Sequence, residues 1–151
     1  MAQTSVRPVA EKDFEDWKRL YQGYADFYQV EMNNQILAMV WSWIQDPQQP
    51  FYALIAISQD NQALGLMHFR AMPSPLRGAM VGFLDDLFVD PTSRGLGVAD
   101  ALFAELKTQA QIHDWPLMRW ITADNNYPAR SLYDQLSTRT GWITYQMDLP
   151  R

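Results

Sequence analysis

One stretch of this chain, residues 84–106, constrains the fold more than any other. It reads LDDLFVDPTSRGLGVADALFAEL: an apolar strand, a turn marked by Pro91, a loop with two glycines and then an amphipathic helix. The N–H groups at the start of such a helix have no partners within it, and the helix dipole places partial positive charge there. The stretch therefore predicts a phosphate site that needs no cationic side chain.

Two common phosphate-binding patterns do not fit the loop Arg94–Ala99. A Walker loop requires Gly-Lys-Ser/Thr, whereas here Asp100 stands where a cation should follow. A dinucleotide fingerprint requires a third glycine and lies at the first strand-to-helix turn of a parallel sheet. This loop instead follows the fourth predicted strand, with three strands before it.

The sequence before the loop predicts a sheet that is mostly antiparallel. Apolar spacing indicates, in order, a strand near a sheet edge, a helix with an aromatic face, a second helix and a meander of three strands. Their ranges are 4–9, 11–28, 35–44, 51–58, 63–71 and 79–89. The run FYALIAIS in the first meander strand is apolar throughout, which is typical of a buried strand.

The sequence after the loop adds a parallel strand at 117–122. A strand, a crossover helix and another strand form a right-handed parallel pair, so this strand should lie parallel to 79–89. A further helix is expected from about Pro128, and a last strand at 141–149. The predicted fold class is α/β (α+β mixed sheet), with one domain over 1–151.

Composition narrows the class of protein. With 151 residues, 48% hydrophobic and 19% charged, the chain is suited to one compact globular domain. Twelve basic and seventeen acidic side chains leave a net charge of −5, which argues against nucleic-acid or anionic membrane partners. The absence of cysteine favours a cytoplasmic location. No apolar run is long enough for a membrane span.

The glycine loop resembles the signature of the GNAT N-acetyltransferase superfamily. The pattern Arg/Gln-x-x-Gly-x-Gly/Ala is filled here by Arg94, Gly97 and Ala99. The order of strands and helices is also similar, as is the N-x-x-A-x-x-x-Y run from Asn126 to Tyr133. The resemblance implies the GNAT fold, a central mixed sheet flanked by helices, with splayed parallel strands 4 and 5.

Two segments, the Tyr-x-x-Phe-Tyr form at 24–28 and the run 130–145, are similar to the histone-and-polyamine branch of the superfamily, whose members acetylate polyamines, basic protein tails or amino acids. The run LDDLFV at 84–89 resembles the Leu-Glu-Asp-Leu-Tyr-Val form of polyamine and thialysine acetyltransferases. Members of this branch form dimers through C-terminal strands, so the resemblance implies a homodimer through 141–149. One departure is that LSTRTGW follows the last helix and leaves a single strand before the terminus, so a neighbouring subunit could complete the sheet.

The resemblance implies that acetyl-CoA is the co-substrate and that no metal takes part. In the family, the loop holds the pyrophosphate of coenzyme A, the pantetheine arm pairs with the fourth strand, and an asparagine contacts the cofactor. The corresponding residues are Arg94, Gly95, Leu96, Gly97, Val98, Ala99 and Asp100 for the pyrophosphate, Leu87, Phe88 and Val89 for the pantetheine, and Asn126. Asn126 also precedes a predicted helix, where asparagine is a good N-cap.

Acetyl transfer to an amine requires a base for the ammonium and an acid for the leaving thiolate, because their pKa values are about 10.4 and about 8.5. The resemblance places the acid at Tyr133. For the base, the candidates are Asp85 and Asp86, two carboxylates in an apolar strand. Neighbours in a strand point to opposite faces, so only one should reach the cleft unless a bulge re-aims the other.

Four further side chains bear on the site. Tyr24 and Tyr28, at the end of the aromatic helix, are expected to bind the substrate. His68 and His113 are interpreted as structural or surface residues, because they lie far from the motifs in sequence and no metal-type residue is suitably spaced beside them.

The sequence therefore predicts an N-acetyltransferase that transfers an acetyl group from acetyl-CoA to a polyamine, a diamine or an amino acid, in a ternary complex. One alternative is the same chemistry on a protein lysine or N-terminus, which requires an open and shallow groove. Another is a coenzyme-A-binding module without catalytic activity.

Overall fold

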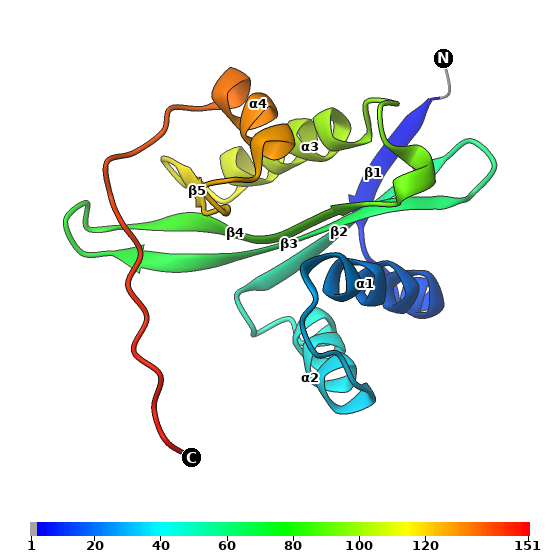
Figure 1. Cartoon of the computed structure of the whole chain (residues 1–151), viewed down its shortest axis with the longest axis horizontal. Coiled ribbons are helices and arrows are strands. Elements are labelled where there is room, and N and C mark those ends of the chain that lie inside the picture. The colour runs from blue at the N-terminus through cyan, green and yellow to red at the C-terminus, as the bar shows by residue number, and fades with distance from the viewer. Residues whose placement is uncertain (1–2) are drawn as a thin grey trace. The chain divides into compact units, whose positions relative to one another are not determined.

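The computed structural model describes residues 3–151 (Figure 1). The chain divides into two compact units, Met1–Trp120 and Ile121–Arg151. The expectation of a single domain over the whole chain stays a prediction. In the described range, no helix is both long enough and apolar enough to cross a membrane.

The first unit is built on a five-stranded mixed sheet with the order β1-β2-β3-β4-β5. The strands are β1 (Thr4–Pro8), β2 (Phe51–Ser58), β3 (Ala63–Ser74), β4 (Ala79–Val89) and β5 (Met118–Trp120). The first four pair antiparallel and β5 pairs parallel with β4. The predicted α/β mixed sheet, its edge strand and its parallel strand pair are confirmed.

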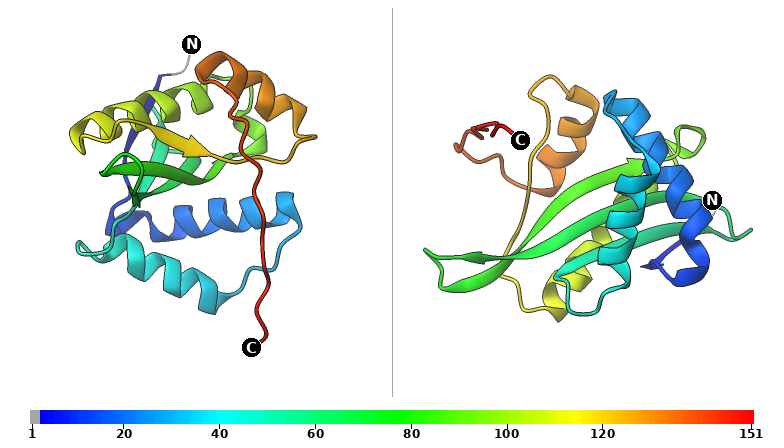
Figure 2. Two further views of the ribbon diagram at one scale, coloured as in Figure 1. Left: turned by 90° about the vertical axis from the view of Figure 1, so that its left-hand side faces the viewer. Right: turned by 90° about the horizontal axis from the view of Figure 1, so that it is seen from below.

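Helices cover both faces of this sheet. They are η1 (Glu11–Asp13), α1 (Phe14–Tyr28), α2 (Asn34–Gln45), η2 (Pro91–Ser93) and α3 (Val98–Ile112). Figures 1 and 2 show α1 and α2 on one face and α3 on the other. The predicted amphipathic helix after the loop is confirmed, because the buried residues of α3 share one side at helical spacing: Val98, Leu102, Phe103, Leu106 and Ala110.

The core beneath α1 and α2 explains the aromatic face of α1. Trp17 and Leu20 are at most 1% exposed and pack with Leu37 of α2 against the sheet. The N-terminus of α2 is capped by Asn33, whose side chain accepts from the N–H of Ile36 at 2.9 Å. The two helices are thereby held as a lid over one face of the sheet.

A β-bulge interrupts the pairing of β3 with β4. Phe69 of β3 lies opposite Leu84, but the residue before it, His68, lies opposite Asp86. Asp85 is therefore the extra residue, and the side chains of Asp85 and Asp86 no longer alternate between the faces. The structure contains the bulge that would allow both carboxylates to reach one cleft.

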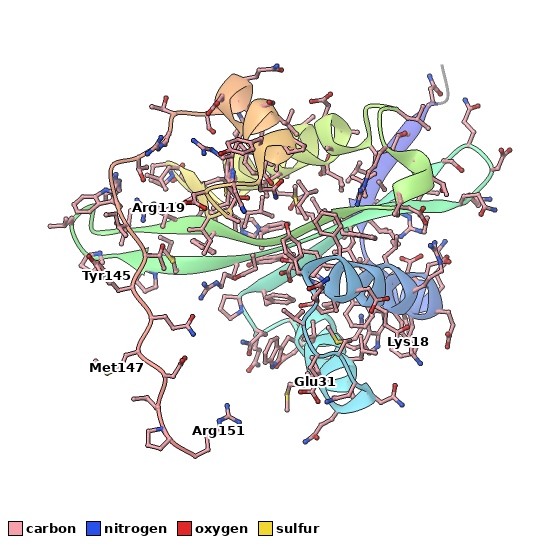
Figure 3. All side chains as sticks on the ribbon, in the orientation of Figure 1. Lys18, Glu31, Arg119, Tyr145, Met147 and Arg151 are labelled. Carbon is pink, nitrogen blue, oxygen red and sulfur yellow. The ribbon has the colours of Figure 1, made fainter. Side chains whose placement is uncertain are left out.

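The second unit contains α4 (Tyr127–Leu136) and an extended segment after it. The predicted strand at 141–149 is wrong for this chain, because these residues are not in a strand. A strand needs a hydrogen-bonded neighbour, and the segment has none in the described chain. Its large side chains are exposed, with Trp142 at 83% and Tyr145 at 89%. Figure 3 shows Tyr145 and Met147 spaced along it.

Candidate active site

A pocket of about 630 Å³ lies on the face of the sheet that α1 and α2 cover. Its lining is aromatic and charged: Tyr21, Val40, Trp43, Gln49, Pro50, Phe51, Arg70, Ala71, Asp85 and Asp86. All of these residues belong to the first unit. Both bulge carboxylates therefore face the same space, and aromatic rings surround it.

Asp86 is held by a buried histidine. His68 is 0% exposed, and its Nδ1 lies 2.8 Å from Oδ2 of Asp86. The indole Nε1 of Trp17 donates to Nε2 of His68 at 2.9 Å. Because an indole N–H can only donate, Nε2 must be an unprotonated acceptor. The remaining ring proton is then on Nδ1 and is donated to Asp86.

Further hydrogen bonds decide the charge of Asp86. Burial acts to raise the pKa of this carboxyl, but hydrogen bonds from His68, Tyr24 and Tyr21 outweigh burial and hold the pKa below its ordinary value. The hydroxyl of Tyr21 donates to Oδ2 at 3.1 Å. Burial, with the neighbouring carboxylate, raises the pKa of Tyr21 and of Tyr24. Asp86 is thus an anion that three donors stabilise.

Asp85 has the opposite tendency. Burial raises the pKa of its carboxyl, Arg70 opposes the rise and the adjacent Asp86 adds to it. Nε of Arg70 donates to its Oδ2 at 3.1 Å, and the Asp85 side chain is 28% exposed. Two neighbouring carboxylates whose environments push their pKa values apart have different roles in acid–base chemistry. Asp85 is the one suited to exchange a proton.

The end of β4 presents an open backbone edge. Pairing with β5 stops at Leu84, opposite Trp120. The N–H of Asp90 donates to Leu64 O at 2.8 Å, so it points toward β3. Directions alternate along a strand, so the N–H groups of Leu87 and Val89 point to the open edge. Val89 O accepts from Nε of Arg94 at 3.4 Å on this side.

Phe88 is oriented differently from its two neighbours. By the same alternation its N–H points toward β3. Its side chain is 6% exposed and packs in the core beneath α1. Of the three residues expected to pair with pantetheine, Leu87 and Val89 have the suitable backbone orientation.

The glycine loop turns the chain from β4 into α3. Gly95 and Gly97 both have φ of +79°, a conformation that glycine adopts without strain. Gly97 is the N-cap of α3, and Asp100 lies in the first turn. Leu96, between the glycines, is 61% exposed. The loop therefore presents its backbone at the positive end of the helix, as a phosphate site requires.

In the second unit, one of the two remaining residues of the motif lies just before α4 and the other lies within it. Asn126 precedes the helix without a side-chain capping bond, and its Nδ2 donates to Thr122 Oγ1 at 3.4 Å. Tyr133 lies half-buried on α4. Both residues have the positions in the helix that the motif implies, and their roles stay predictions.

The tyrosines at the end of α1 differ in their relation to the pocket. Tyr24 is half-buried and contributes to the environment of Asp86. Tyr28 is 43% exposed, with its ring centroid 4.8 Å from that of Tyr24. The tyrosine that lines the pocket is Tyr21, one turn earlier.

His68 is the site residue that sequence reasoning missed. It is structural, as expected, but it contacts Asp86 of the acidic pair. The available signal was the register of the hairpin: Ser74 opposite Ala79 implies that a residue near Asp85 faces position 68. His113 stacks on Trp115 with centroids 4.5 Å apart and is not among the pocket residues. No cluster of His, Asp or Glu suited to a metal occurs in residues 3–151.

The described site combines an acidic pocket, an open strand edge and a glycine loop at a helix start, an arrangement suited to proton exchange and to binding a phosphate group. The model of the Acetyltransferase (GNAT) family matches residues 6–137, and the chain belongs to this family. The family resemblance of the sequence is thereby confirmed.

Relatives agree with this assignment. The D-amino-acid N-acetyltransferase HPA3 of Saccharomyces cerevisiae is 23% identical over 142 residues, covering 93% of this chain and 88% of the relative. Two solved structures share the fold. The ribosomal-protein-alanine N-acetyltransferase of Brucella melitensis has a TM-score of 0.80 at 22% identity, covering 97% and 99% of the two chains. The aminoglycoside N-acetyltransferase AAC(6')-Iy, solved with CoA, has 0.82 at 20%, covering 98% and 96%.

Proposed function

We propose that this N-acetyltransferase acetylates the primary amine of a small molecule. The observation that carries the proposal is the pocket of about 630 Å³, which combines two carboxylates with aromatic walls. A volume of this order suits a small ligand, and the carboxylates attract an ammonium group. The amino-acid acceptor named for the yeast relative supports the same substrate size.

Asp85 acts as the base in the proposed reaction. It takes a proton from the ammonium, directly or through water, while the Asp86 anion keeps the ammonium in the pocket. The neutral nitrogen then attacks the thioester carbonyl carbon in a ternary complex. The C–N bond forms, the C–S bond breaks, and the thiolate of coenzyme A receives a proton from Tyr133. The tyrosinate then takes the second proton of the attacking nitrogen, directly or through water, which leaves a neutral amide.

The open edge and the loop hold acetyl-CoA in this proposal. The outward N–H groups of Leu87 and Val89 pair with the pantetheine arm, and one of them polarises the thioester carbonyl. The N–H groups from Leu96 to Asp100 bind the pyrophosphate at the start of α3. Arg94 and Gly95 complete the loop, and Asn126 contacts the cofactor.

The proposed chemistry is tested by release of free thiol from acetyl-CoA across a panel of small amines and a basic peptide. We expect turnover of small amines, with kcat lowered about 100- to 10,000-fold in Asp85→Asn and lowered in Tyr133→Phe. Asp60→Asn, in the turn after β2, is the matched control and should retain full activity.

Faster turnover of the basic peptide than of any small amine would support the protein-acetylating alternative instead. If Asp85→Asn and Tyr133→Phe both retained wild-type kcat, the assignment of base and acid would be wrong.

We also propose that the chain forms a homodimer through the C-terminal segment, residues 141–149. Apolar Ile143, Tyr145, Met147 and Leu149 alternate there with polar side chains, as in a strand with one buried face. These four side chains are 75–89% exposed in the single chain. A second subunit would supply the hydrogen-bonded neighbour and cover the apolar face.

A further inference from the structure

A cation lines the pocket proposed to receive an amine. Arg70 lies on β3, directly opposite Phe51 of β2 and Phe83 of β4, so the three side chains share the pocket face of the sheet. The Arg70 side chain is 47% exposed. A pocket that selected only positive charge would gain nothing from this guanidinium, because it repels an ammonium.

The guanidinium is oriented but only partly used. Its Nε donates to Oδ2 of Asp85 at 3.1 Å, and its Cζ lies 4.8 Å from the ring centroid of Phe83. This contact with the ring holds the plane of the guanidinium. Its Nη1 and Nη2 make no hydrogen bond to any residue between 3 and 151. The N–H groups of these two nitrogens, held in a fixed plane, therefore remain for a ligand.

The two carboxylates of the pocket do not require those donors. Asp86 already accepts from His68 and Tyr21, and Asp85 is already paired through Nε. A guanidinium that served only to balance Asp85 would be satisfied by this single contact. Its terminal nitrogens have the geometry that binds a carboxylate with two parallel hydrogen bonds.

We propose that Arg70 binds the carboxylate of the substrate, and that the acceptor is an amino acid or a similar amine with a nearby carboxylate. This rests on the proposed function and specifies its substrate class. The ammonium lies at Asp85 and Asp86, and the rest of the substrate packs against Trp43 and Phe51. The walls favour an apolar side chain. In a diamine or polyamine, a second ammonium would instead meet Arg70.

The test compares amino acids with the amines that lack only the carboxylate. Phenylalanine is paired with phenethylamine and leucine with isoamylamine, and both enantiomers of each amino acid are used. We expect wild-type kcat/KM to favour the amino acid of each pair. In Arg70→Gln, the ratio of the two kcat/KM values in each pair should shift about 10- to 100-fold toward the amine. Arg70→Lys keeps the charge but not the planar fork, so its ratio should lie between those of the wild type and Arg70→Gln.

Arg77→Gln is the matched control, because Arg77 lies in the turn between β3 and β4 and is not a pocket residue. It should leave both members of each pair unaffected. Thermal unfolding of each variant shows that it is folded.

Two results would overturn the role of Arg70 alone. One is wild-type preference for the amines or for spermidine over the amino acids. The other is an equal change for both members of a pair in Arg70→Gln, which identifies Arg70 as a counter-ion only. Absence of thiol release with every amine is distinguishable from both, because it would overturn the proposed function and this inference with it.

Discussion

At the scale of single residues, the site depends on which ring nitrogen of His68 holds the proton. The indole of Trp17 occupies Nε2, so Nδ1 must donate to Asp86. The buried indole of Trp17 thus sets the tautomer of His68, and through it the hydrogen bond that Asp86 receives in the pocket. His68 is a positioning residue, because it acts through Asp86.

Two variants of His68 separate its two hydrogen bonds. His68→Asn leaves a donor near the Nδ1 position, and His68→Gln leaves an acceptor near the Nε2 position. Each should lower the free energy of unfolding by about 1–3 kcal/mol, because one buried group loses its partner. Only the Gln variant should raise the pKa of Asp86, as followed by NMR of the carboxyl carbon. An equal rise in both variants would contradict this role.

The two carboxylates of the bulge should affect stability in opposite directions. The pKa of Asp86 is lowered by folding, so its ionisation stabilises the fold above the unfolded pKa, and this contribution is lost as pH falls through the folded value. Asp86→Asn should lower the free energy of unfolding by about 1–3 kcal/mol at pH 7, with a smaller difference in acid.

For Asp85 the sign is reversed. Its pKa is raised by folding, so the native state binds this proton more tightly than the unfolded state does, and ionised Asp85 opposes folding near neutral pH. Asp85→Asn should therefore be as stable as the wild type or more stable at pH 7. Urea denaturation from pH 3 to 8 measures both variants, and equal destabilisation by the two would contradict the assignment. The acid limb of the wild-type rate profile should also be absent in Asp85→Asn.

At the scale of elements, the hairpin of β3 and β4 and the glycine loop build the site. The bulge at Asp85 directs two neighbouring side chains toward the same pocket and shifts the register of the rest of β4. Beyond it, β4 has an open edge that continues directly into the loop and α3. A single stretch of chain thus carries the proposed base, the proposed thioester donors and the proposed phosphate site in sequence.

Gly97 should tolerate alanine poorly for a conformational reason. Its φ is +79°, and an added Cβ would meet no atom within 4 Å. The left-handed conformation costs alanine about 1–2 kcal/mol, so Gly97→Ala should lose that much stability or distort the loop. We expect coenzyme A affinity, measured by calorimetry, to fall about 10-fold.

Gly141→Ala is the matched control for the glycine of the loop. It also has open space, but its φ is not in the left-handed region. Stability should change by less than about 0.5 kcal/mol, with unchanged affinity for coenzyme A. Equal effects of the two substitutions would remove the conformational explanation.

At the scale of the whole molecule, the C-terminal segment, residues 141–149, has no strand partner in the described chain. Its apolar alternation is typical of a strand, yet in a single chain no strand forms at 141–149. Apolar side chains exposed at every second position are more typical of a protein–protein interface than of a surface that faces solvent. We therefore expect substitutions in this segment to change the oligomeric state.

Variants on the two sides of the segment test the proposed dimer. Tyr145→Asp with Met147→Asp should give a monomer by sedimentation, because charges replace the apolar side of the segment. Thr144→Asp with Gln146→Asp, on the other side, should remain a dimer. A wild-type chain that sediments as a monomer at high protein concentration would contradict the proposal.

Much of the fold could be predicted from the sequence because its signals are local. The strand at Phe51–Ser58 has the predicted bounds, and the loop at Gly95 and Gly97 leads into α3 as expected. Apolar periodicity, turn residues and helix starts act over a few neighbouring positions, and a single chain displays them. The same local patterns led to the family.

The tertiary structure decided the chemistry of the pocket. Trp17, His68 and Asp86 meet although 51 and 18 positions separate them in the chain, and Arg70 reaches Asp85 across two strands. A one-residue bulge placed both carboxylates in the pocket, and residues 141–149 stay extended because no strand of the described chain pairs with them, although their pattern suits a strand. Sequence alone determined the loop, the helices and the family, because those depend on near neighbours. Register, burial and partners depend on the packing of distant segments, which only the folded chain specifies.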